Sequence, residues 1–164
     1  MAKMTFKAGE EWALKLGKLG ERSGAIAKQA IFPAADLVIE RIKANLQALP
    51  EDEFRFLRGG DVFTGVPAEL KSELYAAFGL TPMQKDRDGV WNTKVGVDGY
   101  SQQKTRKYKS GVPLPMLARS IERGTSVRKA TPFVKPAVQK SKKEAIAKMQ
   151  QVIDEETEKI MKGK

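Results

Sequence analysis

Helical periodicity at both ends of the chain is the strongest constraint on what this sequence can fold into. Apolar residues recur at about every third or fourth position over residues 23–49 and again over residues 132–161. This spacing is typical of the buried face of an α-helix. The apolar positions are Ile26, Ala30, Ala34, Leu37, Val38, Ile42 and Leu46 in the first stretch, and Val134, Val138, Ala145, Met149, Val152 and Ile160 in the second. A shorter helix over residues 10–19 is expected to stop at Gly20, and Pro33 predicts a kink or a fresh start.

The centre of the chain predicts a small β region between short helices. Residues 91–97 alternate between larger side chains and polar or small ones, which is typical of a half-buried strand. Residues 86–89 predict a turn before it, and residues 61–64 are expected to form another short strand. Short helices, each begun by a proline and ended by a glycine, are expected over residues 67–79 and 113–124.

These elements do not alternate in the strand–helix–strand order of a parallel sheet. We therefore predict one α+β domain over residues 1–164, with a small, mostly antiparallel sheet flanked by long N-terminal and C-terminal helices. Residues 4–7 are expected to form a short strand or a mobile arm. Residues 100–111 are polar, basic and without periodicity, so they predict a mobile basic loop.

The chain contains neither cysteine nor histidine. The usual general base, thiol nucleophiles and the commonest transition-metal ligands are therefore missing. The acidic runs at residues 51–53 and 154–156 lie in polar surroundings, and we interpret them as solvated surface. We expect no enzyme, no catalytic or metal site and no cofactor. No stretch approaches the roughly 20 apolar residues of a membrane helix, so a soluble protein with no membrane partner is expected.

The positive charge is concentrated in one third of the chain. The formal net charge is +10, and residues 101–148 hold 13 Lys and Arg against two acids, Glu122 and Glu144. Such a block favours contact with phosphates or with an acidic protein surface, although a solvated face would look the same. The candidate contact residues are Lys104, Arg106, Lys107, Lys109, Arg128 and Lys129.

Residues 121–137 form the most informative stretch. Gly124 favours the positive φ that ends one helix. After a short basic and polar spacer, Thr131 can cap the next helix with its hydroxyl. Phe133 is expected to anchor the entry of that helix in the core. The stretch therefore predicts a helix end, a turn and a new helix.

In the order of its residues this stretch resembles the phage neck and tail-completion family, whose prototype is a tail component of a Hong Kong-type lambda-like siphophage. That family typically reads Glu-Phe-Gly-Thr and, after a short gap, Pro-Ala-x-Pro-Phe-Leu-Arg-Pro-Ala. The matching positions are Glu122, Gly124, Thr125, Pro132, Phe133, Pro136 and Ala137. Lys135 stands where the family has arginine, and Arg123 replaces its aromatic or apolar residue.

The resemblance implies a structural virion protein of the head–tail connection. Such a protein forms or completes a ring around the DNA channel, most often a hexamer, and contacts the neighbouring connector and tail proteins. It is assembled in the host cytoplasm and then belongs to the neck or tail of the virion. A tail terminator protein is a close alternative, and the sequence leaves that choice open.

A cellular protein that binds nucleic acid without sequence specificity is the competing class. The basic block supports it, as do Tyr100 and Tyr108 among lysines, because aromatic rings stack on bases while lysines contact phosphates. No helix-turn-helix, RNP or zinc pattern is present. Charge alone does not separate this class from a neck protein that lines a DNA passage.

Overall fold

The first helix is one continuous element of 40 residues. The structure, a computed structural model, describes residues 8–53 and 59–162, so the strand or arm expected at residues 4–7 lies outside the described residues. Helix α1 (Ala8–Gln47) runs through Gly20 and contains Pro33 in its interior. The stop at Gly20 and the fresh start at Pro33 are therefore wrong, and the alternative of a kink at Pro33 stays a prediction. A glycine in a helix interior costs only about 1 kcal/mol relative to alanine, so its presence alone does not end the helix.

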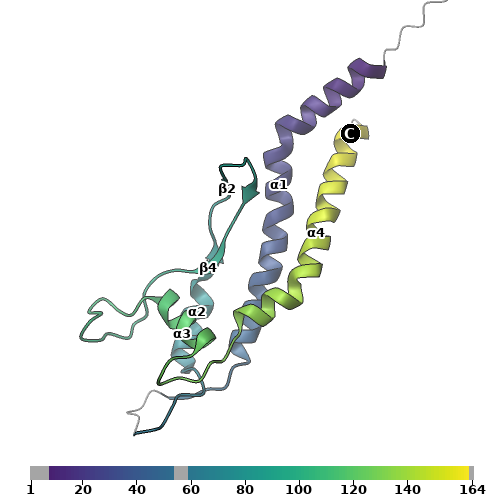
Figure 1. The fold of residues 1–164 in the computed structure, drawn as a ribbon. Coiled ribbons are helices and arrows are strands. Elements are labelled where there is room, and N and C mark those ends of the chain that lie inside the picture. Colours follow the sequence, from purple (N-terminus) through teal and green to yellow (C-terminus); the bar gives the residue numbers. More distant parts are fainter. Residues whose placement is uncertain (1–7, 54–58, 163–164) are drawn as a thin grey trace, which may run out of the picture.

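The last helix lies antiparallel to the first. Helix α4 (Val134–Lys162) packs along α1, and Figure 1 shows the first turns of α1 running past the C-terminal end of α4. An ion pair of 3.6 Å joins Arg41 to Glu144 across the pair. The predicted boundaries of the last helix are confirmed, and with them the long helices at both ends.

The buried stripe of α4 follows the prediction only in part. Ala145 and Ile160 are buried as predicted, Val134, Met149 and Val152 are half-buried, and Val138 exposes 44% of its surface. Ala137 and Ser141, which were not predicted, are buried as well. Ala137 and Ser141 are small enough for α4 to approach its neighbours closely at the start of the helix, and the Ser141 hydroxyl is satisfied by donating to the Ala137 carbonyl at 2.7 Å. A search for apolar periodicity favours large side chains, so it did not identify Ala137 and Ser141 as buried positions at the start of α4.

Between the long helices, the described residues form two short helices with an antiparallel hairpin between them. Helix α2 (Ala68–Ala77) leads directly into β1 (Phe78–Leu80), which pairs with β4 (Val95–Val97). At the far end of the hairpin, β2 (Gln84–Lys85) pairs with β3 (Trp91–Asn92) around the expected turn. These pairings confirm an α+β fold with a small antiparallel β region. Helix α3 (Leu114–Arg123) then ends at Gly124 as predicted.

Two details of the central prediction are wrong. Gly79 lies inside β1 and does not close α2, because the chain becomes extended already at Phe78. Among the described residues the region 61–64 forms no regular strand, and Phe63 makes only a single bridge to Arg128. That bridge connects segments 65 residues apart in sequence, and no local pattern encodes such a contact.

The hydrophobic core lies where the base of the α1–α4 pair meets α2, α3 and β1. Its largest fully buried side chains include Ile42, Leu46, Leu74 and Phe133. The ring of Phe133 meets Phe78 edge-to-face, with 6.0 Å between the centroids, an arrangement that aromatic pairs favour. The core therefore holds one end of the helix pair, and the rest of the pair extends away from it (Figure 1).

Candidate functional site

The joint between α3 and α4 gathers the seven motif residues into one place. Gly124 has φ 76°, and its amide closes α3 by donating to Ser120 at 2.9 Å. A Cβ at this position would approach Ala130 N to 2.8 Å and Arg128 O to 2.9 Å. Both the backbone angle and the crowding therefore require glycine here.

Thr125 closes the spacer into a tight turn. Its amide donates to the Arg128 carbonyl at 2.9 Å, and its hydroxyl oxygen accepts from the Val127 amide at 3.3 Å. On the outer side of the turn, Phe63 donates its amide to Val127 O and accepts from Lys129 N, both at 2.9 Å. The spacer is thereby tied to the segment that precedes α2.

Glu122 caps α4, a role that the sequence prediction assigned to Thr131. One carboxylate oxygen accepts from the amides of Phe133 at 2.7 Å and Val134 at 2.9 Å, and the other accepts from Lys135 at 2.9 Å. Thr131 instead donates its amide and its hydroxyl to the Ile121 carbonyl. A carboxylate prevails over a hydroxyl because it satisfies several unpaired amides and places a negative charge at the positive end of the helix dipole.

Phe133 has the buried position that the sequence predicts. Its side chain is fully buried, and its carbonyl accepts from the Asn45 side chain at 3.0 Å, which ties the start of α4 to α1. Pro132 is exposed just before it, Pro136 lies half-buried in the first turn of α4, and Ala137 is fully buried. The motif residues thus set the angle at which α4 leaves the core.

Lys71 is a buried charge that the sequence prediction missed. It exposes 3% of its surface, and its ammonium donates to the carbonyls of Gln47 and Leu49 at the end of α1 and approaches Glu51 at 3.4 Å. The sequence feature that could have indicated this burial is that Lys71 directly follows Leu70 in a short helix with a buried apolar face. A cation at the C-terminal end of α1 matches the negative end of that helix dipole.

The candidate phosphate contacts do not form one group. Arg128 is buried, donates to the Gly65 carbonyl and lies over the Phe63 ring at 5.6 Å. Burial lowers the pKa of its guanidinium, and the charge of Asp52 partly offsets this. We therefore remove Arg128 from the candidate phosphate contacts, because its guanidinium is buried in contacts within the chain. Lys129 beside it is exposed and remains a candidate.

The remaining candidates are exposed on the loop at residues 100–111, namely Lys104, Arg106, Lys107 and Lys109. The base of the loop is closed by hydrogen bonds from Ser101 N to Val112 O and from Val112 N to Gln103 O. At its tip, the Tyr108 hydroxyl meets the Met116 sulfur at 3.6 Å. Four cations are therefore presented together on one defined loop, whose mobility stays a prediction.

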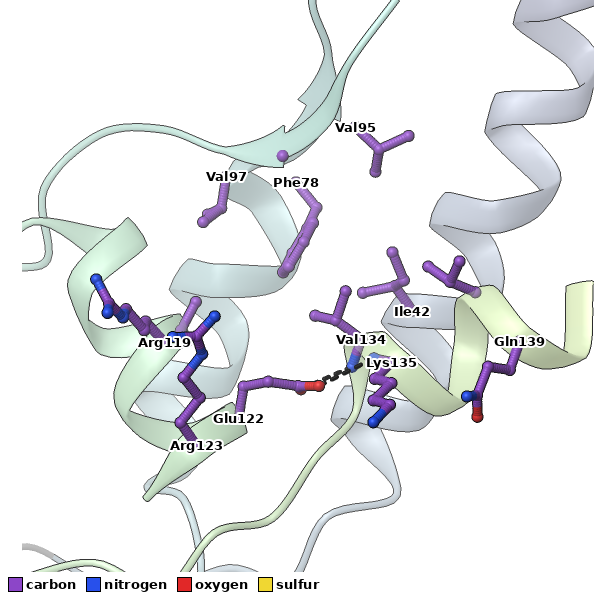
Figure 2. A pocket seen from close by; sticks show the side chains of 13 residues that line it. Ile42, Phe78, Val95, Val97, Arg119, Glu122, Arg123, Val134, Lys135 and Gln139 are labelled. Atoms are coloured by element: carbon purple, nitrogen blue, oxygen red, sulfur yellow. Dashed lines mark hydrogen bonds between the residues drawn. The ribbon is translucent and has the colours of Figure 1, made fainter. Parts of the chain in front are cut away.

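A groove of about 500 Å³ opens beside the joint (Figure 2). Apolar side chains from α1, the β region and α4 line it, among them Ile42, Phe78 and Val134. Arg119, Arg123 and Lys135 are exposed around it. As the dashed lines in Figure 2 show, the carboxylate of Glu122 is directed at the first turn of α4.

Over residues 8–53 and 59–162, no group of three or more acidic side chains has the arrangement of a metal site. No helix in these ranges is long and apolar enough to cross a membrane. Comparisons of the chain with models of protein families, with curated proteins and with solved structures gave no match.

Proposed function

We propose that this chain is a structural protein of a phage or prophage virion, a neck or tail-completion component without enzymatic activity. It forms or completes a ring, a hexamer, around the DNA channel of the head–tail connection. It is assembled in the host cytoplasm and contacts the connector and tail proteins on either side. No cofactor takes part in this role.

The observation that carries the proposal is the joint at residues 121–137. The matched residues act together there: Glu122 caps α4, Gly124 turns the chain and Phe133 fixes the new helix in the core. The motif is therefore architectural, as expected if the resemblance to the neck family is genuine. Such a motif orients a long helix and does not build a reaction centre.

The projecting part of the helix pair supports an assembly role. Leu14 and Leu16 on α1 expose 68% and 57% of their surface, and Ile146 and Ile153 on α4 expose 50% and 40%. Exposed apolar residues on neighbouring helices favour burial against another protein. In a cyclic ring each subunit must present two different surfaces to its neighbours, and this helix pair offers one of them.

The mass of the purified protein in solution, followed by electron microscopy, tests the proposal. A ring of several protomers with a central channel supports it, and a tail terminator would give a ring as well. Assembly on the head side or on the tail side, measured with the corresponding partner proteins, distinguishes these two positions. A stable single protomer under all these conditions contradicts the ring.

The exposed cations of the 100–111 loop favour a second candidate, a nucleic-acid-binding protein. Binding through Lys104, Arg106, Lys107 and Lys109 is expected to be weak, indifferent to sequence and steeply reduced by salt. A titration of duplex DNA at several salt concentrations measures this. A footprint on one defined sequence that survives physiological salt would favour the cellular DNA-binding protein over the neck protein.

A further inference from the structure

The groove beside the joint is an apolar surface that the chain itself leaves open. Ile42 and Phe78 are almost fully covered elsewhere, yet they line this depression together with Val134. Val138 stands at the same wall with 44% of its surface exposed. A volume of about 500 Å³ falls within the roughly 300–1,000 Å³ of typical ligand pockets. The groove can therefore receive at least one large apolar side chain.

The charges around this groove are unbalanced. Arg119, Arg123 and Lys135 line it, and none of the ion pairs between described residues involves them. The one acidic side chain at the groove is Glu122, whose two oxygens already accept three backbone amides. Three cations of like sign around an apolar depression attract a ligand that carries negative charge.

We propose that this groove docks a short acidic segment of another protein. The segment seats a large apolar side chain over Phe78 and Val134 and directs flanking carboxylates to Arg119, Arg123 and Lys135. Duplex nucleic acid fits less well, because its bases are stacked inside and its phosphate backbone has no apolar group to bury against an apolar floor. The inference holds whether or not the chain forms a ring.

A second copy of this chain matches the groove poorly. Around the exposed Leu14 and Leu16 of α1, residues 8–22 hold three acidic and three basic residues, so this segment brings no net negative charge to the positive rim. On α4, the exposed Ile153 precedes Asp154 and Glu155. Their carboxylates, however, already accept from Gln150 at 2.9 Å and Gln151 at 2.8 Å along the helix. A different protein is therefore the better occupant.

Selection from a library of short random peptides tests the proposal without a known partner. We expect the enriched peptides to combine an excess of Asp and Glu with a large apolar residue. The binding of one synthetic enriched peptide is then measured by fluorescence anisotropy. The variant Arg119→Glu/Arg123→Glu is expected to weaken it by about tenfold or more. Lys104→Glu/Lys107→Glu, the matched control with the same change of charge on the loop, is expected to leave it nearly unchanged.

Val138→Glu is a second variant, which places a negative charge at the exposed wall of the groove and is expected to weaken the same peptide. The proposal is overturned if no peptide is enriched, if the enriched peptides carry no excess of acids, or if the loop variant loses binding as strongly as the groove variant. Competition by a single-stranded oligonucleotide at the groove overturns it as well. So does self-association that is lost specifically in Arg119→Glu/Arg123→Glu, since the occupant would then be a second copy.

Discussion

The two ends of the α1–α4 pair are built from similar apolar residues, yet the fold uses them differently. At the base, Leu46 and Phe133 are fully buried. At the far end, Leu14 and Leu16 expose 68% and 57% of their surface, on turns of α1 that run past the end of α4 (Figure 1). Among the described residues, the base therefore holds the largest fully buried side chains of the helix pair, Ile42, Leu46 and Phe133. We infer that the projecting end is shaped for contact with another molecule.

Charged groups also differ between the two ends: they are buried or half-buried at the base and exposed toward the far end. The base holds Glu122 at the start of α4 and Lys71 at the end of α1, each partly or fully buried and matched to the helix dipole. Toward the end of α4 the ion pairs Glu156–Lys159 and Glu158–Lys162 lie on the surface of one helix. Solvent screens pairs of that exposed kind, so they contribute little to stability. Loss of the contacts that Glu122 or Lys71 makes at the base should therefore lower the stability of the chain far more than loss of an exposed ion pair.

Phe133→Ala is expected to have the largest effect on the stability of the chain. Removing a fully buried phenylalanine costs about 3–5 kcal/mol, a large part of the stability of a small domain. Thermal melting measures the loss, and Lys135→Ala, at an exposed neighbouring position, is the control with an expected change of about 0–1 kcal/mol. If the lysine variant melts lower than the phenylalanine variant, the joint depends on charge and not on packing.

Gly124→Ala should destabilise the base by about 2 kcal/mol or more. The positive φ disfavours any Cβ, and the added carbon would stand 2.8 Å from Ala130 N. Gly79→Ala is the control, since it has a negative φ and nothing within 4 Å of an added Cβ. Chemical denaturation of both variants compares them. Equal midpoints would show that the turn can relax and does not fix α4.

Glu122→Gln should cost about 1–2 kcal/mol, because a neutral amide replaces the charged acceptor of three backbone amides at the start of α4. Glu158→Gln, which alters an exposed pair with Lys162, should leave the melting temperature nearly unchanged. Melting temperatures and amide exchange in the first turn of α4 provide the measurement. Unchanged amide exchange in Glu122→Gln would contradict the capping role.

Gly17→Ala should stabilise the chain slightly, by about 0.5–1 kcal/mol, because nothing lies within 4 Å of its added Cβ and alanine favours the helix. Gly24→Ala should do the opposite. Its Cβ would approach the Trp91 ring to 2.8 Å, where the hairpin packs on α1. Comparing the two variants shows where along α1 the helix begins to pack against the rest of the chain. If both variants stabilise the chain, the hairpin is not packed against α1.

Local features of the sequence predicted the large elements and part of the joint. Periodicity gave the two long helices, and the residue types of Gly124 and Phe133 gave a helix end and a buried anchor, both confirmed. The cap on α4 was missed because Glu122 lies eleven residues before Phe133, so its contact exists only once α3 and α4 are folded together. Thr131 is of a residue type that commonly caps helices, but its hydroxyl donates to the Ile121 carbonyl and does not cap α4.

Burial of charge was the other feature that the sequence did not reveal. Lys71 and Arg128 look like members of a solvated basic surface, but each fills a place among backbone carbonyls supplied by distant segments. The expected stop at Gly20 failed for a different reason. A glycine inside a helix costs only about 1 kcal/mol relative to alanine, and α1 continues through it.

The most direct test of the division between the two ends is the mass in solution of Leu14→Gln/Leu16→Gln beside the parent protein. Both side chains are exposed, so the variant should melt within about 0.5 kcal/mol of the parent. We predict that the parent sediments as a ring, about six times the protomer mass of 18.2 kDa, and the variant as the protomer. A variant that assembles like the parent, or one that loses its fold instead of its assembly, would contradict this account of the projecting end.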